Sequence, residues 1–597
     1  MEEFISDIPL INPDIWISNE EFYKAQLLKL PNWKQIPLLN CNASHNLPDG
    51  ALVRFKGMVQ DMRSPEFYFE KLEVMNFLTS EVTLKCGKYR DTCNLLQHEK
   101  ITNTDVANAG ERHPYVIVSI PGFNEWAQKV EDQQNQCYYL DQPNTSKRLN
   151  VRYKRSLEEG DEHGMEAARA DDTHKRDAKT LDTAGHSSAV SREHLLNFPL
   201  PDVPSQSCHV KIYQECKELK LNDLIEVVGF LSVDPALSAE FQREKAFLIP
   251  QLETEEELLT HNPPPSLIPR LHVVHYKKLR HCNPLIDKPV EQETSIKNAA
   301  VVREHLLKVL SEMMFGDTLA AEFFICYLIS HVYLRQEALT VGQFCLNLSD
   351  LPLDKCPNYP QQLYELMKLM LTQCYLLPLT VENLNTMAFL PQKDFQCNRL
   401  TSGVLQLSRG THLVLDETKM VPGCLDNAGV TNMAAIASLI TTQKVEYNYK
   451  FFVMPLESDI PILILSEGKS LLPSEFYLPL KPEPSTLEIF DATTEAVKHY
   501  LKEDILNEIR IYLTSLKFTK YTISENIQYV EDDFVEMRTL SKEMSEDDLH
   551  RLLVLSRLIG LSRGIDTLTK ECWDIAKKME NDRVKRVAAR KTSHNEI

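Results

Sequence analysis

Two short apolar runs, residues 412–415 and 462–465, mark the second half of the chain. Each is bounded by Gly or Pro and ends in polar residues, as parallel strands buried on both faces do. Apolar stretches at 343–348 and 375–380 predict two further strands. Helical periodicity predicts helices at 301–314, 320–334 and 361–374. The pattern predicts an α/β core over residues 295–486, followed by a helical region over residues 487–597.

The first half instead alternates apolar and polar residues, which is typical of half-buried strands. Gly57 and Gly229 lie where a curled strand needs relief from side-chain crowding. We therefore expect a small closed barrel of the oligonucleotide-binding (OB) type, in two parts, residues 46–143 and 192–285, after a helical cap at 1–45. Its expected strands are 51–61, 66–69, 82–86, 115–120, 208–213, 221–234 and 270–276.

The two parts of the barrel are separated by a charged segment, residues 144–191, with almost no aromatic residues. Such a segment buries too little apolar surface to offset its chain entropy, so we predict that it is disordered. Its basic clusters, 152–155 and 175–176, are either a nuclear-import signal or solvated charge. A second predicted linker, acidic and ending in three prolines, spans residues 254–265.

Composition narrows the classes of function. The net charge of −20 argues against a protein whose main task is to bind phosphate backbones. The 14 cysteines are scattered without C-x-x-C spacing, which favours a reducing compartment over a zinc ribbon or a disulfide framework. No apolar run approaches the length of a membrane span, and the acidic amino terminus does not resemble a signal peptide. We therefore expect protein partners, no membrane, and direct nucleic-acid binding to be unlikely.

Seven residues of the expected barrel keep a nucleic-acid interpretation open. OB barrels bind single strands through exposed aromatic side chains and basic grooves. In the alternative interpretation, the aromatic side chains belong to the barrel core. The seven are Arg54, Phe55, Lys56, Tyr68, Lys88, Tyr89 and Arg90.

Asp416 and Glu417 follow a predicted core strand, where many ATPases hold a Mg²⁺-linked acid and a water-orienting base. A phosphate loop requires G-x-x-x-x-G-K-[ST]. Gly468-Lys469-Ser470 matches its end, but Leu463 occupies the position of the first Gly. The loop at 349–358 has no paired glycines and contains two prolines, which lack an amide donor. We predict no nucleotide cofactor, no metal and no catalytic residue; alternatively, Asp416 and Glu417 simply cap the strand and the next helix.

Distinctive stretches spread along the chain include Val53-Arg-Phe-Lys-Gly-Met-Val-Gln-Asp-Met62, Leu415-Asp-Glu-Thr418, Ser466-Glu-Gly-Lys-Ser-Leu-Leu-Pro473 and Val530-Glu-Asp-Asp-Phe-Val-Glu-Met-Arg538. Through these stretches the chain resembles the MCM-binding protein family, eukaryotic partners of the minichromosome maintenance (MCM) replicative helicase. A fainter resemblance is to the helicase subunits themselves: residues 403–420 look like their Walker B segment, Ser466 falls at the sensor position, and helices at 545–580 look like their lid.

The resemblance implies a multidomain α/β protein: a split OB-like barrel followed by a degenerate AAA+-like core, with vestigial Asp416, Glu417 and Ser466. It also implies a non-catalytic nuclear protein that binds MCM subunits in a partial complex and reaches chromatin indirectly. Its expected role is to assist assembly or unloading of the helicase, with a link to sister-chromatid cohesion. The alternatives are an AAA+-like ATPase and a single-strand-binding OB-fold protein.

Overall fold

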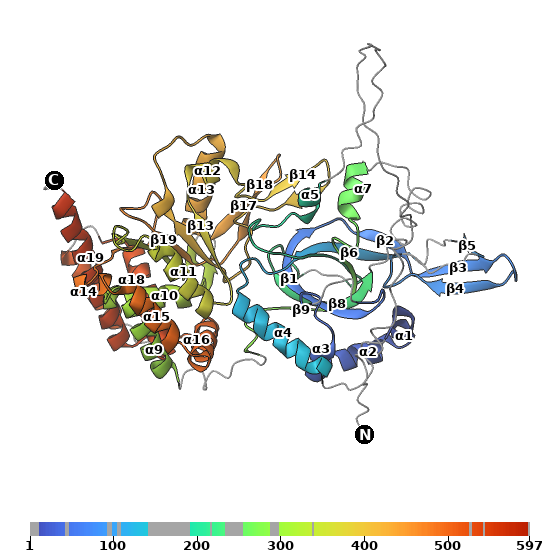
Figure 1. Cartoon of the computed structure of the whole chain (residues 1–597), viewed down its shortest axis with the longest axis horizontal. Helices are drawn as coiled ribbons and strands as arrows, with labels where there is room; N and C mark the ends of the chain where they lie inside the picture. Colours follow the sequence, from blue (N-terminus) through green and yellow to red (C-terminus); the bar gives the residue numbers. More distant parts are fainter. Residues whose placement is uncertain are drawn as a thin grey trace, which may run out of the picture.

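The computed structural model describes residues 11–41, 47–91, 98–103, 109–140, 191–214, 218–232, 255–286, 298–336, 339–523, 528–540 and 544–594. Within them the protein is a mixed α/β molecule with several separate sheets. Figure 1 shows a β-barrel and an α/β core side by side along the longest axis. No helix of the described part is both long and apolar enough to cross a bilayer. The predicted charged linker, residues 144–191, lies outside the described residues except for its last position.

The barrel closes through five strands, because β1 pairs with both β8 and β6. Around the ring, β8 is antiparallel to β9, β9 is parallel to β7, and β7 is antiparallel to β6. Chain segments on both sides of residues 141–190 therefore build one ring. The strands are β1 (Leu52–Met62), β6 (Ala109–Val118), β7 (Ser207–Ile212), β8 (Leu224–Ser232) and β9 (Arg270–Lys278).

The two glycines singled out in the barrel strands are required by close backbone approach. A Cβ atom on Gly57 would lie 2.2 Å from the carbonyl oxygen of Val118, and one on Gly229 would lie 2.5 Å from that of His272. Any side chain at either position would push two paired strands apart.

Two of the strands expected in the barrel lie outside the ring. β2 (Glu66–Phe69) pairs only with the start of β6. β4 (Val82–Cys86) pairs with β3 (Lys71–Asn76), which also pairs with β5 (Glu99–Asn103). This separate three-stranded sheet, which we call the finger, projects from the barrel on the side away from the α/β core (Figure 1). Alternating polarity does not distinguish strands of the barrel from strands of an inserted sheet, so both looked alike in sequence.

The α/β core contains a five-stranded sheet in the order β13-β16-β19-β12-β20, and every pairing is parallel. Both faces are buried: Val414 and Leu463 belong to one apolar cluster, whereas Leu415 and Ile464 belong to another. The prediction of strands buried on both faces is therefore confirmed. The strands are β12 (Cys345–Ser349), β13 (Cys374–Pro378), β16 (His412–Asp416), β19 (Ile462–Leu465) and β20 (Phe476–Pro479).

Small sheets flank the core. A four-stranded sheet has the order β15-β14-β17-β18, and β10 and β11 form a two-stranded ribbon. The helix predicted at 320–334 ends at Ile329, because Ser330 is extended and the chain then enters β10. These strands are β10 (Leu334–Gln336), β11 (Leu339–Val341), β14 (Gln392–Asp394), β15 (Arg399–Thr401), β17 (Lys444–Asn448) and β18 (Val453–Glu457).

Helices cover the barrel and both faces of the core sheet. The prediction that residues 254–265 form a linker is wrong in part, because seven of them form the helix α7. In this helix the acidic residues precede a short apolar stretch. The barrel side carries α1 (Pro13–Ser18), α2 (Glu20–Leu27), α3 (Leu30–Gln35), α4 (Glu125–Leu140), α5 (Arg192–Leu196) and α7 (Glu255–His261). The core carries α9 (Ala299–Met313), α10 (Thr318–Ile329), α11 (Tyr359–Met370), α12 (Val381–Thr386), η4 (Glu417–Lys419) and α13 (Asn427–Thr442). The last part carries α14 (Pro484–Leu487), α15 (Phe490–Tyr500), α16 (Glu503–Leu516), α17 (Gln528–Leu540), α18 (Glu546–Ser562) and α19 (Lys570–His594).

Buried polar contacts join barrel and core. The indole nitrogen of Trp126 donates to the carbonyl oxygen of Leu371 at 2.7 Å. On β1, the side chain of Gln60 donates to the carbonyl oxygen of Leu400, and Asp61 accepts from the Leu400 amide at 3.0 Å. Because these groups are buried, they bond to one another in place of water and fix how the two units meet.

Candidate functional site

The carboxyl edge of the core sheet is where the sequence placed vestigial nucleotide-binding residues. Asp416 ends β16, and in the parallel register it faces Leu465, the last residue of β19. Ser466 comes directly after that residue. The structure therefore brings Asp416, Glu417 and Ser466 to one edge of the sheet.

The two acidic residues at this edge are engaged within the chain. Asp416 is buried and accepts from the amide of Thr418 at 3.0 Å and from its hydroxyl at 2.5 Å. Glu417 accepts from the hydroxyl of Ser470 at 2.7 Å. Burial raises the pKa of Glu417, although its hydrogen bonds from Ser470 and the Leu471 amide act in the opposite direction. In the sequence alternative, Asp416 and Glu417 cap the strand and the next helix; Asp416 does cap the short helix η4, whereas Glu417 bonds to the segment around Ser470.

The residue at the sensor position is also held by neighbours. Ser466 is buried, accepts from the side-chain amide of Asn347 at 2.8 Å, and donates to the carbonyl oxygen of Gly468 at 2.7 Å. Asn347 lies in the middle of β12, so this contact joins two adjacent strands.

The loop that follows β12 occupies the position at which an ATPase would bind phosphate. Three of its backbone amides instead donate hydrogen bonds to carbonyl groups of the chain. The amide of Asp350 donates to the Glu467 carbonyl at 3.2 Å, and the amide of Cys356 donates to that of Pro352 at 2.8 Å. The amide of Lys355 also donates to Pro352. A phosphate cradle requires several amides directed at one anion, and these three are directed elsewhere.

An arginine from the last helix lies at this loop. The guanidinium of Arg590 pairs with the carboxylate of Asp350 at 2.5 Å. One turn earlier, Arg586 pairs with Asp317 at 2.5 Å. Two arginines near the basic end of α19 therefore dock the helix on the core. These two ion pairs could not be predicted from the sequence, because each arginine and its acidic partner are far apart along the chain.

A cavity of about 410 Å³ opens beside Glu417 and Ser466. Its other wall is mainly apolar, and its one lysine, Lys469, is exposed to solvent. This lining lacks the convergent hydrogen-bond donors that a nucleoside triphosphate needs.

The seven barrel residues considered for single-strand binding make contacts within the protein. Three are aromatic and buried, but only Phe55 belongs to the barrel core that the alternative interpretation proposed. The four cations each pair with a carboxylate, so their charge is already compensated. The aromatic residues are Phe55, Tyr68 and Tyr89, and the pairs are Arg54–Glu226, Lys56–Glu131, Lys88–Glu20 and Arg90–Asp14.

One cluster that the sequence did not predict has metal-ligand chemistry. The ligand atoms of His194, Asp394 and Cys397 lie within 4.8 Å of one another. However, Arg399 donates to His194 Nδ1 at 2.9 Å and lies 3.8 Å from a carboxylate oxygen of Asp394. The guanidinium thus supplies a positive charge to these residues itself. That the protein needs no metal stays a prediction.

Two groups of exposed apolar side chains have the character of protein-binding surfaces. The first, the hairpin patch, lies at the β17–β18 turn, where Phe451 is 81% exposed. The second, the finger patch, lies on the three-stranded sheet and its turn, where Leu78 is 72% exposed. The hairpin patch consists of Phe395, Phe451, Phe452 and Val453, and the finger patch consists of Phe77, Leu78, Val82 and Leu84.

Comparison with known proteins yields one consistent result. A family model described as Mini-chromosome maintenance replisome factor matches residues 23–587. The chain is 39% identical over 578 residues to a Drosophila melanogaster protein named Mini-chromosome maintenance complex-binding protein, covering 94% of each chain. It is 36% identical over 621 residues to the Homo sapiens protein of that name, covering 97% of this chain and 95% of the other. The Danio rerio protein of that name is 37% identical over 601 residues, covering 96% and 94% respectively.

Proposed function

This chain belongs to the mini-chromosome maintenance complex-binding protein family, and on that premise we propose that it binds MCM helicase subunits without catalysing a reaction. It acts in the nucleus as an assembly chaperone or unloading factor that holds a partial MCM complex, with a downstream effect on sister-chromatid cohesion. The observation that carries the proposal is that the match extends over nearly the whole length of relatives named for binding this complex.

The order of the domains supports an architecture like that of the helicase subunits that we propose it binds. The five-stranded ring with a single parallel pairing, β7 with β9, fits the OB type. Numbered in chain order, the core strands lie in the order 5-1-4-3-2 and all pairings are parallel, which supports an α/β core of the kind that the AAA+ resemblance implies. We infer an OB-like tier followed by an AAA+-like tier, the two-tier plan of a helicase subunit.

The carboxyl edge of the core supports a non-catalytic role. The loop after β12 directs its amides to carbonyl groups, and Arg590 lies on Asp350 where a phosphate would be bound. An AAA+ subunit shares nucleotide sites with its neighbours in a ring. A look-alike without a nucleotide site can occupy one flank of a subunit and leave that shared site incomplete.

This arrangement gives a mechanism for chaperoning. A ligand shifts an assembly equilibrium only by its differential affinity for the states concerned. The protein must therefore bind free or partly assembled subunits more tightly than the closed ring. Binding through a flank that ring closure covers would satisfy this requirement.

The hairpin patch and the finger patch supply candidate contact surfaces, because aromatic and aliphatic side chains of this size dominate interface energetics. The hairpin patch lies on the AAA+-like tier and the finger patch on the barrel tier. Both tiers would then contact the client, and each patch can be tested by itself.

The deciding experiment is co-purification of tagged full-length protein from nuclear extract at moderate salt, with every associated chain quantified by mass spectrometry. We expect helicase subunits in a set that lacks at least one ring member. Recovery of no helicase subunit would refute the proposal. Recovery of all ring members in equal amounts would refute the partial-assembly mechanism.

Variants then locate the contact. Replacing Phe451 and Phe452 by Asp tests the hairpin patch, and replacing Val82 and Leu84 by Asp tests the finger patch. We expect at least a tenfold loss of recovered subunits for the patch that makes the main contact. The matched control is Lys578→Asp, a charge change at an exposed position of α19.

Two measurements on the purified protein address the rival classes. ATP with Mg²⁺ is expected to leave the melting temperature unchanged, whereas an ATPase would be stabilised by a ligand that binds the folded state. A labelled single-stranded oligonucleotide is expected not to bind at moderate salt. Tight binding that weakens steeply with added salt would favour the single-strand-binding alternative.

A further inference from the structure

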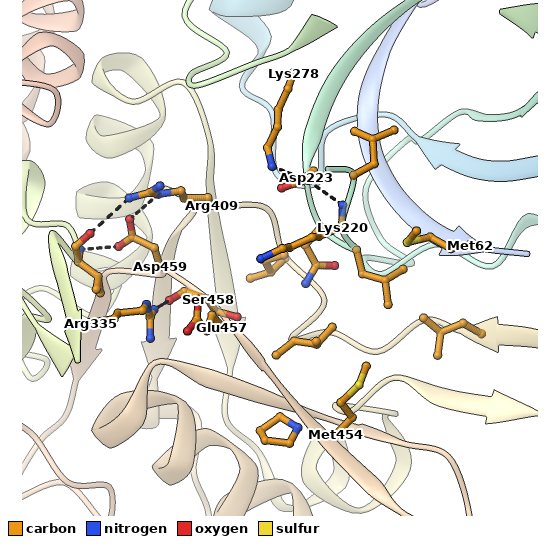
Figure 2. Close-up of a pocket in the computed structure, with 18 of the residues that line it drawn as sticks. Met62, Lys220, Asp223, Lys278, Arg335, Arg409, Met454, Glu457, Ser458 and Asp459 are labelled. Carbon is orange, nitrogen blue, oxygen red and sulfur yellow. Dashed lines mark hydrogen bonds and ion pairs between the residues drawn. The ribbon is translucent and has the colours of Figure 1, made fainter. Parts of the chain in front are cut away.

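A long cleft separates the barrel from the α/β core. It consists of two adjoining cavities of about 940 and 950 Å³, which share residues of both units. Figure 2 shows the first cavity, where Asp223 and Lys278 of the barrel side lie opposite Arg409 and Asp459 of the core. The second cavity continues past Tyr333 to α18 and to the segment that follows α16.

The second cavity is strongly cationic although the protein carries a net charge of −20. Among its lining residues only Asp223 is acidic, and it pairs with Lys278 at 2.7 Å. Arg409 pairs with Asp459, whose other carboxylate oxygen accepts from the amide of Val332 at 2.8 Å. The lining cations that pair with no carboxylate among the described residues are Arg280, Lys517, Lys520 and Arg557.

Arg557 is the most constrained of these four cations. It is 6% exposed, and its Nη1 has no hydrogen-bond partner. Its guanidinium carbon lies 4.1 Å from the ring centre of Tyr333, and Nη2 lies 3.4 Å from a ring nitrogen of His331. Burying a guanidinium without an anion is unfavourable, so the cleft holds a fork of donors that a carboxylate or phosphate would complete.

Lys517 extends the same site. Its ammonium group donates to His412 Nε2 at 2.9 Å, and burial lowers its pKa to about 8. It lines a small recess of about 70 Å³ together with Arg280 and His331, and the one carboxylate in this lining, Asp459, is paired with Arg409. A recess of this size has room for one anionic group, next to a cleft that has room for a chain.

The remaining lining decides between a peptide and a nucleic acid. Aliphatic side chains such as Leu339, Ile523 and Leu553 stand beside the cations. The β10–β11 ribbon borders the cleft and has no third strand among the described residues, so an extended peptide can add to its edge. The lining also contains the aromatic residues Tyr333, Phe518 and Tyr521, which a single strand could use as stacking platforms. The guanidinium of Arg557 already packs on the ring of Tyr333, so the aliphatic side chains and the ribbon edge favour a peptide of alternating acidic and apolar residues.

We propose that this cleft is a docking site for an acidic, apolar peptide segment of a partner protein, with one carboxylate seated between Arg557 and Lys517. The site lies away from the carboxyl edge of the core sheet and from the finger patch, whereas the first cavity of the cleft borders the hairpin patch through Tyr449 and Met454. It goes beyond the proposed function, because it requires a peptide ligand of stated chemistry and no particular partner.

The test uses purified full-length protein and a phage-displayed library of random twelve-residue peptides. The same selection is run on the variant Arg280→Glu/Lys520→Glu, which changes two exposed cations of the cleft. A matched control, Lys502→Glu/Lys578→Glu, changes two exposed lysines that do not line the cleft. Because the selection needs no helicase subunit, its outcome is independent of the proposed function.

We expect enrichment of peptides in which Asp or Glu alternates with apolar residues. An enriched peptide should bind the cleft variant at least tenfold more weakly than wild type and the control variant within twofold. Arg557→Gln should weaken binding by a similar factor, with an unchanged circular dichroism spectrum. Enrichment of non-acidic peptides, or equal enrichment on the cleft variant, would overturn the proposal. Displacement of the peptide by a twelve-nucleotide single strand at lower concentration than by unlabelled peptide would also overturn it, in favour of a nucleic-acid ligand.

Discussion

Removing the Arg586 side chain should undock the last helix from the core, because it leaves a buried carboxylate without its cation. The side chain of Asp317 is 1% exposed and accepts four hydrogen bonds. Two come from Arg586, at 2.5 and 2.8 Å. The others come from the amides of Ala320, at 3.1 Å, and Lys481, at 3.0 Å. This one carboxylate thus joins the start of α10, the segment after β20 and α19.

The magnitude follows from what remains after the change. Removing one partner of a buried ion pair costs about 3–5 kcal/mol. The side chain of Arg586 is 23% exposed, and the two amides continue to solvate the carboxylate, so we expect a cost below that range, about 2–3 kcal/mol. At about 1.4 kcal/mol per tenfold change, hydrogen exchange of the α19 amides should become roughly 30- to 150-fold faster.

Hydrogen exchange measured by mass spectrometry detects the local opening of α19 directly. The control is Lys585→Ala, whose side chain is 78% exposed on the same helix, and which should change α19 exchange less than threefold. In the double variant Asp317→Asn/Arg586→Ala no charge remains unpaired, so its effect should be smaller than the sum of the single effects. Unchanged α19 exchange in Arg586→Ala, or additive effects in the double variant, would refute the reasoning.

Three other predictions concern the barrel and its junction. Gly57→Ala should lower the melting temperature by about 6 °C or more, because its Cβ would meet the opposite strand at 2.2 Å, whereas Gly468→Ala, whose Cβ has no neighbour within 3.8 Å, should be neutral in the same thermal scan. Burial, opposed by Asp91, lowers the pKa of His272 to about 4, so the unfolded chain binds the extra proton and stability should fall as pH drops from about 6.5 towards 4. Denaturant titrations measure the free energy of unfolding at pH 6.5 and at pH 5. Its decrease between the two should be about 2 kcal/mol smaller in His272→Gln than in wild type; an equal decrease would contradict the role assigned to His272. Trp126→Ala should speed hydrogen exchange on both sides of the barrel–core junction by opening a cavity worth about 3 kcal/mol, and a change confined to α4 would argue against coupling.

The local pattern of the chain was sufficient for its main elements. Apolar runs closed by turn residues identified β16 and β19, because strands buried on both faces need apolar side chains at every position. The crowding at Gly57 was also predicted from sequence and is present in the structure. Family membership followed from stretches spread over nearly the whole chain, and the comparisons confirm it.

Only the tertiary structure decided which of these elements pair and which charges meet. β4 has the same alternating pattern as the barrel strands, but it pairs within the finger, since polarity alone does not choose a partner strand. Arg590 meets Asp350, and Arg280, Lys517 and Arg557 converge on one cleft, although nothing in their local sequence relates them. Hydrophobic periodicity is a property of neighbouring residues, whereas charge compensation and clefts depend on segments that folding brings together from distant parts of the chain.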